Sequence, residues 1–142
     1  MTSEIPLLQF RLADQIYALF IDQVIEVAAM VQITPLSQSH PAILGIIDRH
    51  GTPLIMLDLR LVFGKPGSTV DAETLFIVAE HRGQQIGLVV DEVLQVEYAT
   101  RLRAAPSGSD YLYGVVSQNM QLTQIIALEA LIEGYLSGEI EV

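Results

Sequence analysis

The chain has 142 residues, enough for one ordinary domain or for two very small modules that share a core. It is 51% hydrophobic and has no cysteine, which excludes disulfides, thiolate metal sites and cysteine nucleophiles and is typical of a reducing cytoplasm. The net charge of −10 argues against binding to nucleic acid, and no apolar run is long enough to insert directly into a membrane.

Short β-strands are the main prediction from the apolar pattern. Residues 8–12 alternate strictly between apolar and polar, and 16–21 follow after the polar pair Asp14-Gln15, which indicates a hairpin. Three further strand pairs surround turn-rich segments, namely 43–47 with 54–59, 74–79 with 85–90, and 111–116 with 121–127. This spacing predicts an all-β fold built from barrels or a sandwich.

Two segments break the β-like pattern. Residues 63–69 are rich in glycine, proline and serine, so we expect a connector there. Residues 128–136 carry apolar side chains at helical spacing, which predicts one short C-terminal amphipathic helix. We therefore expect a single domain over 7–136, made of a first module at 7–63, a linker at 64–73 and a second module at 74–136.

An internal repeat supports this division. Shifted by 69 residues, the segment 19–27 falls on 88–96, and Gly45-Ile46-Ile47 falls on Gly114-Val115-Val116. The following turn and strand coincide at the same offset. Two modules of this size would each be marginal alone, so we expect them to share an apolar interface. A cleft between the modules is a natural place for a binding site.

Groups for catalysis, metal binding or cofactor binding are not evident. The three histidines lie in predicted loops without a second ligand at a recognised spacing, and no phosphate-binding or nucleophile motif occurs. Asp22 and Asp91 are related by the repeat, which favours a shared role as a turn or helix cap, and Asp58 fits a similar hydrogen-bonding role. We predict a protein without catalytic, cofactor or metal residues.

Four sequence blocks, in order, resemble the CheW family of bacterial chemosensory coupling proteins. They are Ile21-Asp22-Gln23-Val24-Ile25-Glu26-Val27, then Gly45-Ile46-Ile47-Asp48 with Leu57-Asp58-Leu59-Arg60, then Gly87-Leu88-Val89-Val90-Asp91-Glu92-Val93, and finally Gly114-Val115-Val116. The resemblance runs from about residue 8 to residue 136. It implies two SH3-like five-stranded β-barrels and an adaptor that couples the cytoplasmic tip of a chemoreceptor to a CheA-type histidine kinase, without a cofactor.

The resemblance also implies a receptor-binding groove between the barrels. The matching positions in this chain are Val24, Glu26, Gly45, His50, Gly51 and Gly87. An apolar side chain there offers contact area, and the glycines permit close backbone approach or positive φ angles.

The turn before Gly51 departs from the family pattern. The family has asparagine, an apolar residue and arginine where this chain has Asp48, Arg49 and His50, and that arginine is expected to pair with the glutamate matched by Glu26. Histidine lacks the bidentate fork of arginine. Arg49 takes this role only if the turn changes register, because a shift of one residue normally reverses the face of a strand. A divergent adaptor, for instance in a pathway controlling type IV pili, is one interpretation.

Two other functional classes stay open from the sequence alone. A small-ligand-binding β protein would use the cleft between the modules. A carboxylate-based hydrolase would use Asp22, Asp58 or Asp91, and would require these side chains to lie close together rather than bond their own backbone.

Overall fold

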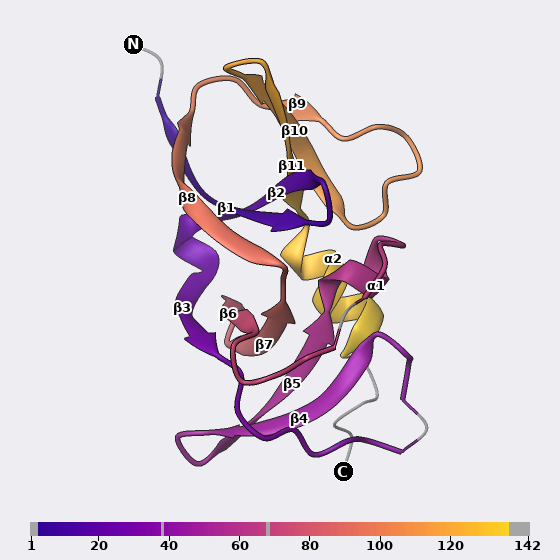
Figure 1. Cartoon of the computed structure of the whole chain (residues 1–142). Coiled ribbons are helices and arrows are strands. Elements are labelled where there is room, and N and C mark those ends of the chain that lie inside the picture. Colours follow the sequence, from indigo (N-terminus) through magenta and orange to yellow (C-terminus); the bar gives the residue numbers. More distant parts are fainter. Residues whose placement is uncertain (1–2, 38, 68, 137–142) are drawn as a thin grey trace.

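The computed structural model describes residues 3–37, 39–67 and 69–136, which form mainly β-strands (Figure 1). The strands are β1 Ile5–Leu12, β2 Gln15–Phe20, β3 Val24–Ala29, β4 Ile43–Arg49, β5 Thr52–Asp58, β6 Leu75–His81, β7 Gln84–Val89, β8 Glu92–Ala99, β9 Arg103–Ala104, β10 Leu112–Gln118 and β11 Gln121–Ile126. The helices are η1 Ile21–Gln23, α1 Leu59–Val62 and α2 Leu128–Tyr135. The predicted all-β fold with one short C-terminal helix is confirmed.

The strands form two curled sheets with α2 between them (Figure 1). We call the five-stranded sheet β3-β6-β7-β5-β4 barrel I, and the six-stranded sheet β8-β1-β2-β11-β10-β9 barrel II. In barrel I the segment after β3 returns to β4, where Thr34 and Ile46 exchange two backbone hydrogen bonds of 2.8 Å. In barrel II the two-residue strand β9 adds a sixth member to the expected five.

The sequence repeat is also a structural repeat. An offset of 69 residues carries β1, β2 and β3 onto β6, β7 and β8, and it carries β4, β5 and α1 onto β10, β11 and α2. Backbone details follow the same offset: Ala13 and Arg82 have φ of 56° and 52°, and His50 and Asn119 have φ of 52° and 54°. The two halves therefore share turn geometry as well as strand order.

The first hairpin of each repeat lies in the barrel of the other repeat. The β1–β2 hairpin joins barrel II, where β2 runs parallel to β11, and the β6–β7 hairpin joins barrel I, where β7 runs parallel to β5. The two barrels therefore do not follow the expected division into 7–63 and 74–136. Alternation within a strand defines its faces but not its partner, so the sequence pattern could not reveal this exchange.

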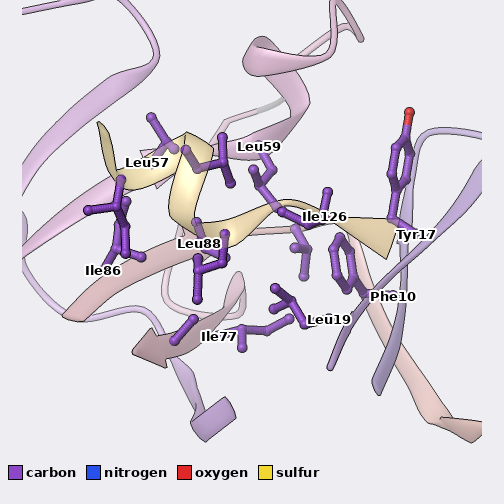
Figure 2. Close-up of a cluster of buried hydrophobic side chains, with 14 of the residues drawn as sticks. Phe10, Tyr17, Leu19, Leu57, Leu59, Ile77, Ile86, Leu88 and Ile126 are labelled. Carbon is purple, nitrogen blue, oxygen red and sulfur yellow. The ribbon is translucent and has the colours of Figure 1, made fainter. Parts of the chain in front are cut away.

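The largest apolar cluster lies between the barrels. It combines side chains of β1 and β2 with those of β5, β6, β7 and α2. Figure 2 shows Phe10 and Leu19 from barrel II on one side of this cluster and Ile86 and Leu88 from barrel I on the other. Each barrel also has a smaller apolar interior of its own. The shared interface predicted from module size is therefore the main core of the molecule.

A buried arginine ties the two barrels together at the end of β5. Asp58 caps α1 by accepting a hydrogen bond of 3.0 Å from the Arg60 backbone N–H, and its carboxylate also accepts from Arg60 Nε at 2.9 Å and Nη2 at 3.0 Å. The Arg60 side chain, 2% exposed, reaches Asp91 Oδ1 at 3.2 Å. Asp91 Oδ2 in turn accepts from the backbone N–H of Ala13, in the β1–β2 turn, at 2.7 Å. Asp58 thus has the capping role favoured from the sequence, whereas Asp91 bonds to Ala13 and Arg60, which are distant in sequence, rather than capping a turn or helix as expected for it and Asp22.

Removing this arginine tests its contribution to stability. Arg60→Ala leaves the Asp58 carboxylate, 4% exposed, without its cation, so we expect the free energy of unfolding to fall by about 3–5 kcal/mol. Arg11→Ala is the control, because it breaks an exposed ion pair with Glu92 and is expected to cost less than about 1 kcal/mol. Urea denaturation measures both, and equal losses would contradict the central role of Arg60.

Separating the repeats tests the hairpin exchange. Fragments 1–69 and 70–142 each lack the hairpin that completes their barrel, so neither is expected to show a cooperative unfolding transition alone. Far-UV circular dichroism during urea titration makes the measurement, with the equimolar mixture as the comparison. A cooperative transition in either fragment by itself would show that the exchange is not required for folding.

Candidate protein-binding site

The six positions singled out by resemblance all lie in barrel I. Val24 and Glu26 are on β3, Gly45 is on β4, His50 and Gly51 form the β4–β5 turn, and Gly87 is on β7. They do not form one continuous surface. Gly45 and Gly87 are buried in the wall of the barrel, whereas His50 and Gly51 are exposed.

An ion pair between Glu26 and Arg49 joins the two outer strands of barrel I. Arg49 Nε donates to Glu26 Oε1 at 2.8 Å, and the two side chains are 19% and 39% exposed respectively. Arg49 lies two residues after Ile47, which points into the barrel, so alternation places both on the inner face. The guanidinium therefore holds a carboxylate that is still partly open to solvent.

Two further polar side chains extend the hydrogen-bond network of this ion pair at the same end of barrel I. Arg49 Nη1 lies 3.5 Å from Gln85 Oε1, and Gln85 Nε2 lies 3.4 Å from Glu80 Oε1. Arg49 and Gln85 also line an open hollow of about 540 Å³ together with His50 and Thr52. These contacts restrict the Arg49 side chain, and through it the Glu26 carboxylate.

The ion pair to Glu26 is therefore made by Arg49, whereas His50 lies at the exposed tip of the turn. Asp48 Oδ1 accepts from the Gly51 N–H at 2.9 Å, which closes the turn and leaves His50 with a φ of 52°. The site predicted from the sequence did not include Arg49. Its placement two residues after the buried Ile47 was the available signal, because residues i and i+2 of a strand share a face.

Gly45 and Gly87 make room for neighbouring groups inside the barrel. Both pair with Met56, which lies between them on β5. A Cβ atom on Gly87 would lie 2.4 Å from Met56 Sδ, and one on Gly45 would lie 2.2 Å from the carbonyl oxygen of Thr34. Gly45 also has a φ of 143°, at a bulge in β4. Packing alone accounts for these two glycines.

Val24 lies at the rim between the barrels. Its side chain is partly buried and packs against the inter-barrel cluster, as does that of Val93, its counterpart in the second repeat. Along the same strand, Ile25 and Val27 are 42% and 40% exposed. The outer face of β3 thus presents apolar side chains, whereas Glu26 points to the opposite face, where it meets Arg49. None of the helices in the described ranges is long and apolar enough to cross a membrane.

Comparisons with known proteins agree on one family. A model of the CheW-like domain matches residues 6–135. The probable chemotaxis protein CheW of Rhizobium etli is 29% identical over 132 residues, covering 88% of this chain and 85% of the relative. The chemotaxis protein CheW of Bacillus subtilis is 26% identical over 144 residues, covering 94% of this chain and 92% of the relative.

A solved structure extends the agreement to three dimensions. The crystal structure of the scaffolding protein TtCheW from Thermoanaerobacter tengcongensis has a TM-score of 0.80 and 27% identity to this chain, and the match covers 89% of each chain. Its two-subdomain fold is the one described above. The chain therefore belongs to the family of CheW-like domains and is a coupling adaptor of chemotaxis signalling, as the order of its sequence blocks predicted.

Proposed function

We propose that this adaptor acts in the cytoplasm, without catalysis, and links the cytoplasmic tip of a chemoreceptor to a CheA-type histidine kinase. The observation that carries the proposal is the CheW-like match over residues 6–135, supported by the TM-score of 0.80 to a scaffolding protein. The carboxylates of Asp58 and Asp91 are engaged with Arg60, which disfavours a hydrolase. The comparisons do not favour a small-ligand-binding protein.

The receptor-binding surface is proposed to lie on β3 and the adjoining end of barrel I. Val24 supplies apolar contact at the rim between the barrels, and Glu26 supplies a carboxylate whose position Arg49 restricts. A restricted side chain loses less conformational freedom on binding, so such a carboxylate selects its partner more sharply. Gly45, Gly51 and Gly87 contribute by shaping the wall and the turn that carry these groups.

The altered turn at 48–50 supports a divergent adaptor rather than the loss of coupling. The carboxylate–guanidinium pair is present, but its arginine is one position earlier than in the family pattern. His50 is consequently displayed at the tip beside Arg49, where it can contact a partner that differs from the usual receptor. Membership of a chemosensory pathway other than the flagellar one is therefore part of the proposal.

Charge reversal at Glu26 tests the receptor surface. Glu26→Lys places two cations together and removes the carboxylate, so we expect at least a tenfold loss in affinity for the cognate receptor tip, or about 1.4 kcal/mol. Glu73→Lys makes the same charge change at an exposed residue and serves as the control. Co-sedimentation with receptor and kinase gives the readout, and unchanged receptor binding by Glu26→Lys removes this residue from the site.

A comparison of Arg49 with His50 tests which residue holds the carboxylate. Arg49→Ala frees Glu26 and removes a partly buried charge, so we expect weaker receptor binding and about 1–2 kcal/mol lower stability. His50→Ala should leave stability within about 0.5 kcal/mol, because its side chain is exposed. Urea denaturation and receptor co-sedimentation measure both variants. A larger stability loss for His50→Ala would reverse the assignment.

A further inference from the structure

The hollow at the turn end of barrel I is bounded by three parts of the chain that are far apart in sequence. Its volume is about 540 Å³. Arg49 and His50 line it from the β4–β5 turn, Gln84 and Gln85 from the start of β7, and Leu136 from the end of α2. The hollow thus connects the altered turn with the last residue that the structure describes.

The guanidinium of Arg49 has donors to spare in this hollow. Its Nε donates to Glu26 Oε1 at 2.8 Å, and its Nη1 lies 3.5 Å from Gln85 Oε1. A guanidinium carries five N–H donors, and the others have no partner among residues 3–37, 39–67 and 69–136. The side chain is 19% exposed, so a second carboxylate can approach it from solvent.

The charge around the hollow favours an anionic occupant. Arg82 directly precedes Gly83 of the lining and is 81% exposed, and its Nη1 lies 4.0 Å from Glu129 Oε1, beyond hydrogen-bond distance. The two carboxylates nearest to Arg49 and Gln85 are those of Glu26 and Glu80, and both are already bonded there. Two arginines therefore meet at this end of a chain whose net charge is −10.

The segment that follows Leu136 has the complementary charge. Residues 137–142 read Ser-Gly-Glu-Ile-Glu-Val, with two acidic residues and no basic one. Leu136 itself is held in place, because its backbone N–H donates to the Ile132 carbonyl oxygen at 2.9 Å and its side chain, 5% exposed, packs in the inter-barrel cluster. The segment thus begins at the wall of the hollow, and six residues can span about 20 Å.

We propose that residues 137–142 dock in this hollow, with a glutamate carboxylate bonded to the remaining N–H donors of Arg49. Attachment at Leu136 gives the segment an effective concentration in the millimolar range, so a weak contact is enough to keep it docked much of the time. The docked segment covers Arg49 and His50, and a partner that uses this end of barrel I has to displace it. This last step rests on the receptor surface proposed above.

Order parameters of the tail amides in the ¹⁵N-labelled full chain test the docking. We expect values above about 0.6 for residues 139–141 at low salt, because backbone below that value is flexible. In 1 M NaCl the Debye length is about 3 Å, so the values should fall and the amide resonances of His50, Gln84 and Gln85 should move. Values below about 0.6 at low salt would overturn the proposal.

A pair of matched variants isolates the carboxylates. Glu139→Gln together with Glu141→Gln keeps the shape of the tail and should reproduce the effect of high salt on the order parameters and on the hollow amides. Glu4→Gln together with Glu73→Gln removes the same charge at two exposed positions elsewhere and is the control. An equal response to both double variants, or no response to the first, would show that no contact with Arg49 holds the segment.

Receptor binding tests the covering role separately. A segment that is docked three-quarters of the time raises the apparent Kd about fourfold, so the Glu139→Gln, Glu141→Gln variant should bind the receptor tip about fourfold more tightly. Equal affinities together with an ordered tail would show that the segment does not cover the receptor surface. If neither protein binds the receptor, receptor coupling fails, whereas the order parameters still decide whether the segment docks.

Discussion

The exchange of hairpins between the repeats is the constraint on which the rest of the structure depends. Because β2 completes barrel II and β7 completes barrel I, neither barrel contains a sheet made from one contiguous half of the chain. The main apolar cluster accordingly lies between the barrels, with the smaller clusters inside them. The relative placement of the two barrels is therefore set by the same contacts that fold them, which suits a coupling adaptor.

The repeat accounts for the strand order and turn geometry that the two halves share. Positions where the two halves carry different side chains indicate where each half has a role of its own. Glu26 and Arg49 form an ion pair in barrel I, whereas their counterparts at the same offset are Gln95 and Gln118. Those glutamines bond elsewhere: Gln118 Nε2 donates to the carbonyl oxygen of Tyr98 at 3.2 Å. One backbone plan thus carries an ion pair at these two positions in barrel I and two neutral glutamines at the equivalent positions in barrel II.

Much of this architecture was predictable because it depends on local patterns. Strict alternation identified the strands, helical spacing identified α2, and a single offset identified the repeat. The exchange of hairpins was not predictable, since an apolar strand face fits more than one neighbour and parallel pairing depends on contacts far apart in sequence. The ion pair was anticipated only conditionally, because Arg49 was considered as the partner of Glu26 solely if the turn changed register. His50 occupies the position of the family's arginine, but the inward face of β4 continues from Ile47 to Arg49.

The turn geometry explains why Arg49, rather than His50, makes the ion pair to Glu26. Asp48 closes the turn and His50 adopts a left-handed conformation, so the inward-facing position of β4 falls on Arg49 rather than on the residue before Gly51. The carboxylate of Glu26 is still held at 2.8 Å by a guanidinium that is largely shielded from solvent. The fold of this chain thus places a charged pair at the end of barrel I, and the exposed tip residue takes no part in it. The identity of the exposed tip residue is then free to differ, and the tip is where a divergent adaptor can acquire a new preference without disturbing its core.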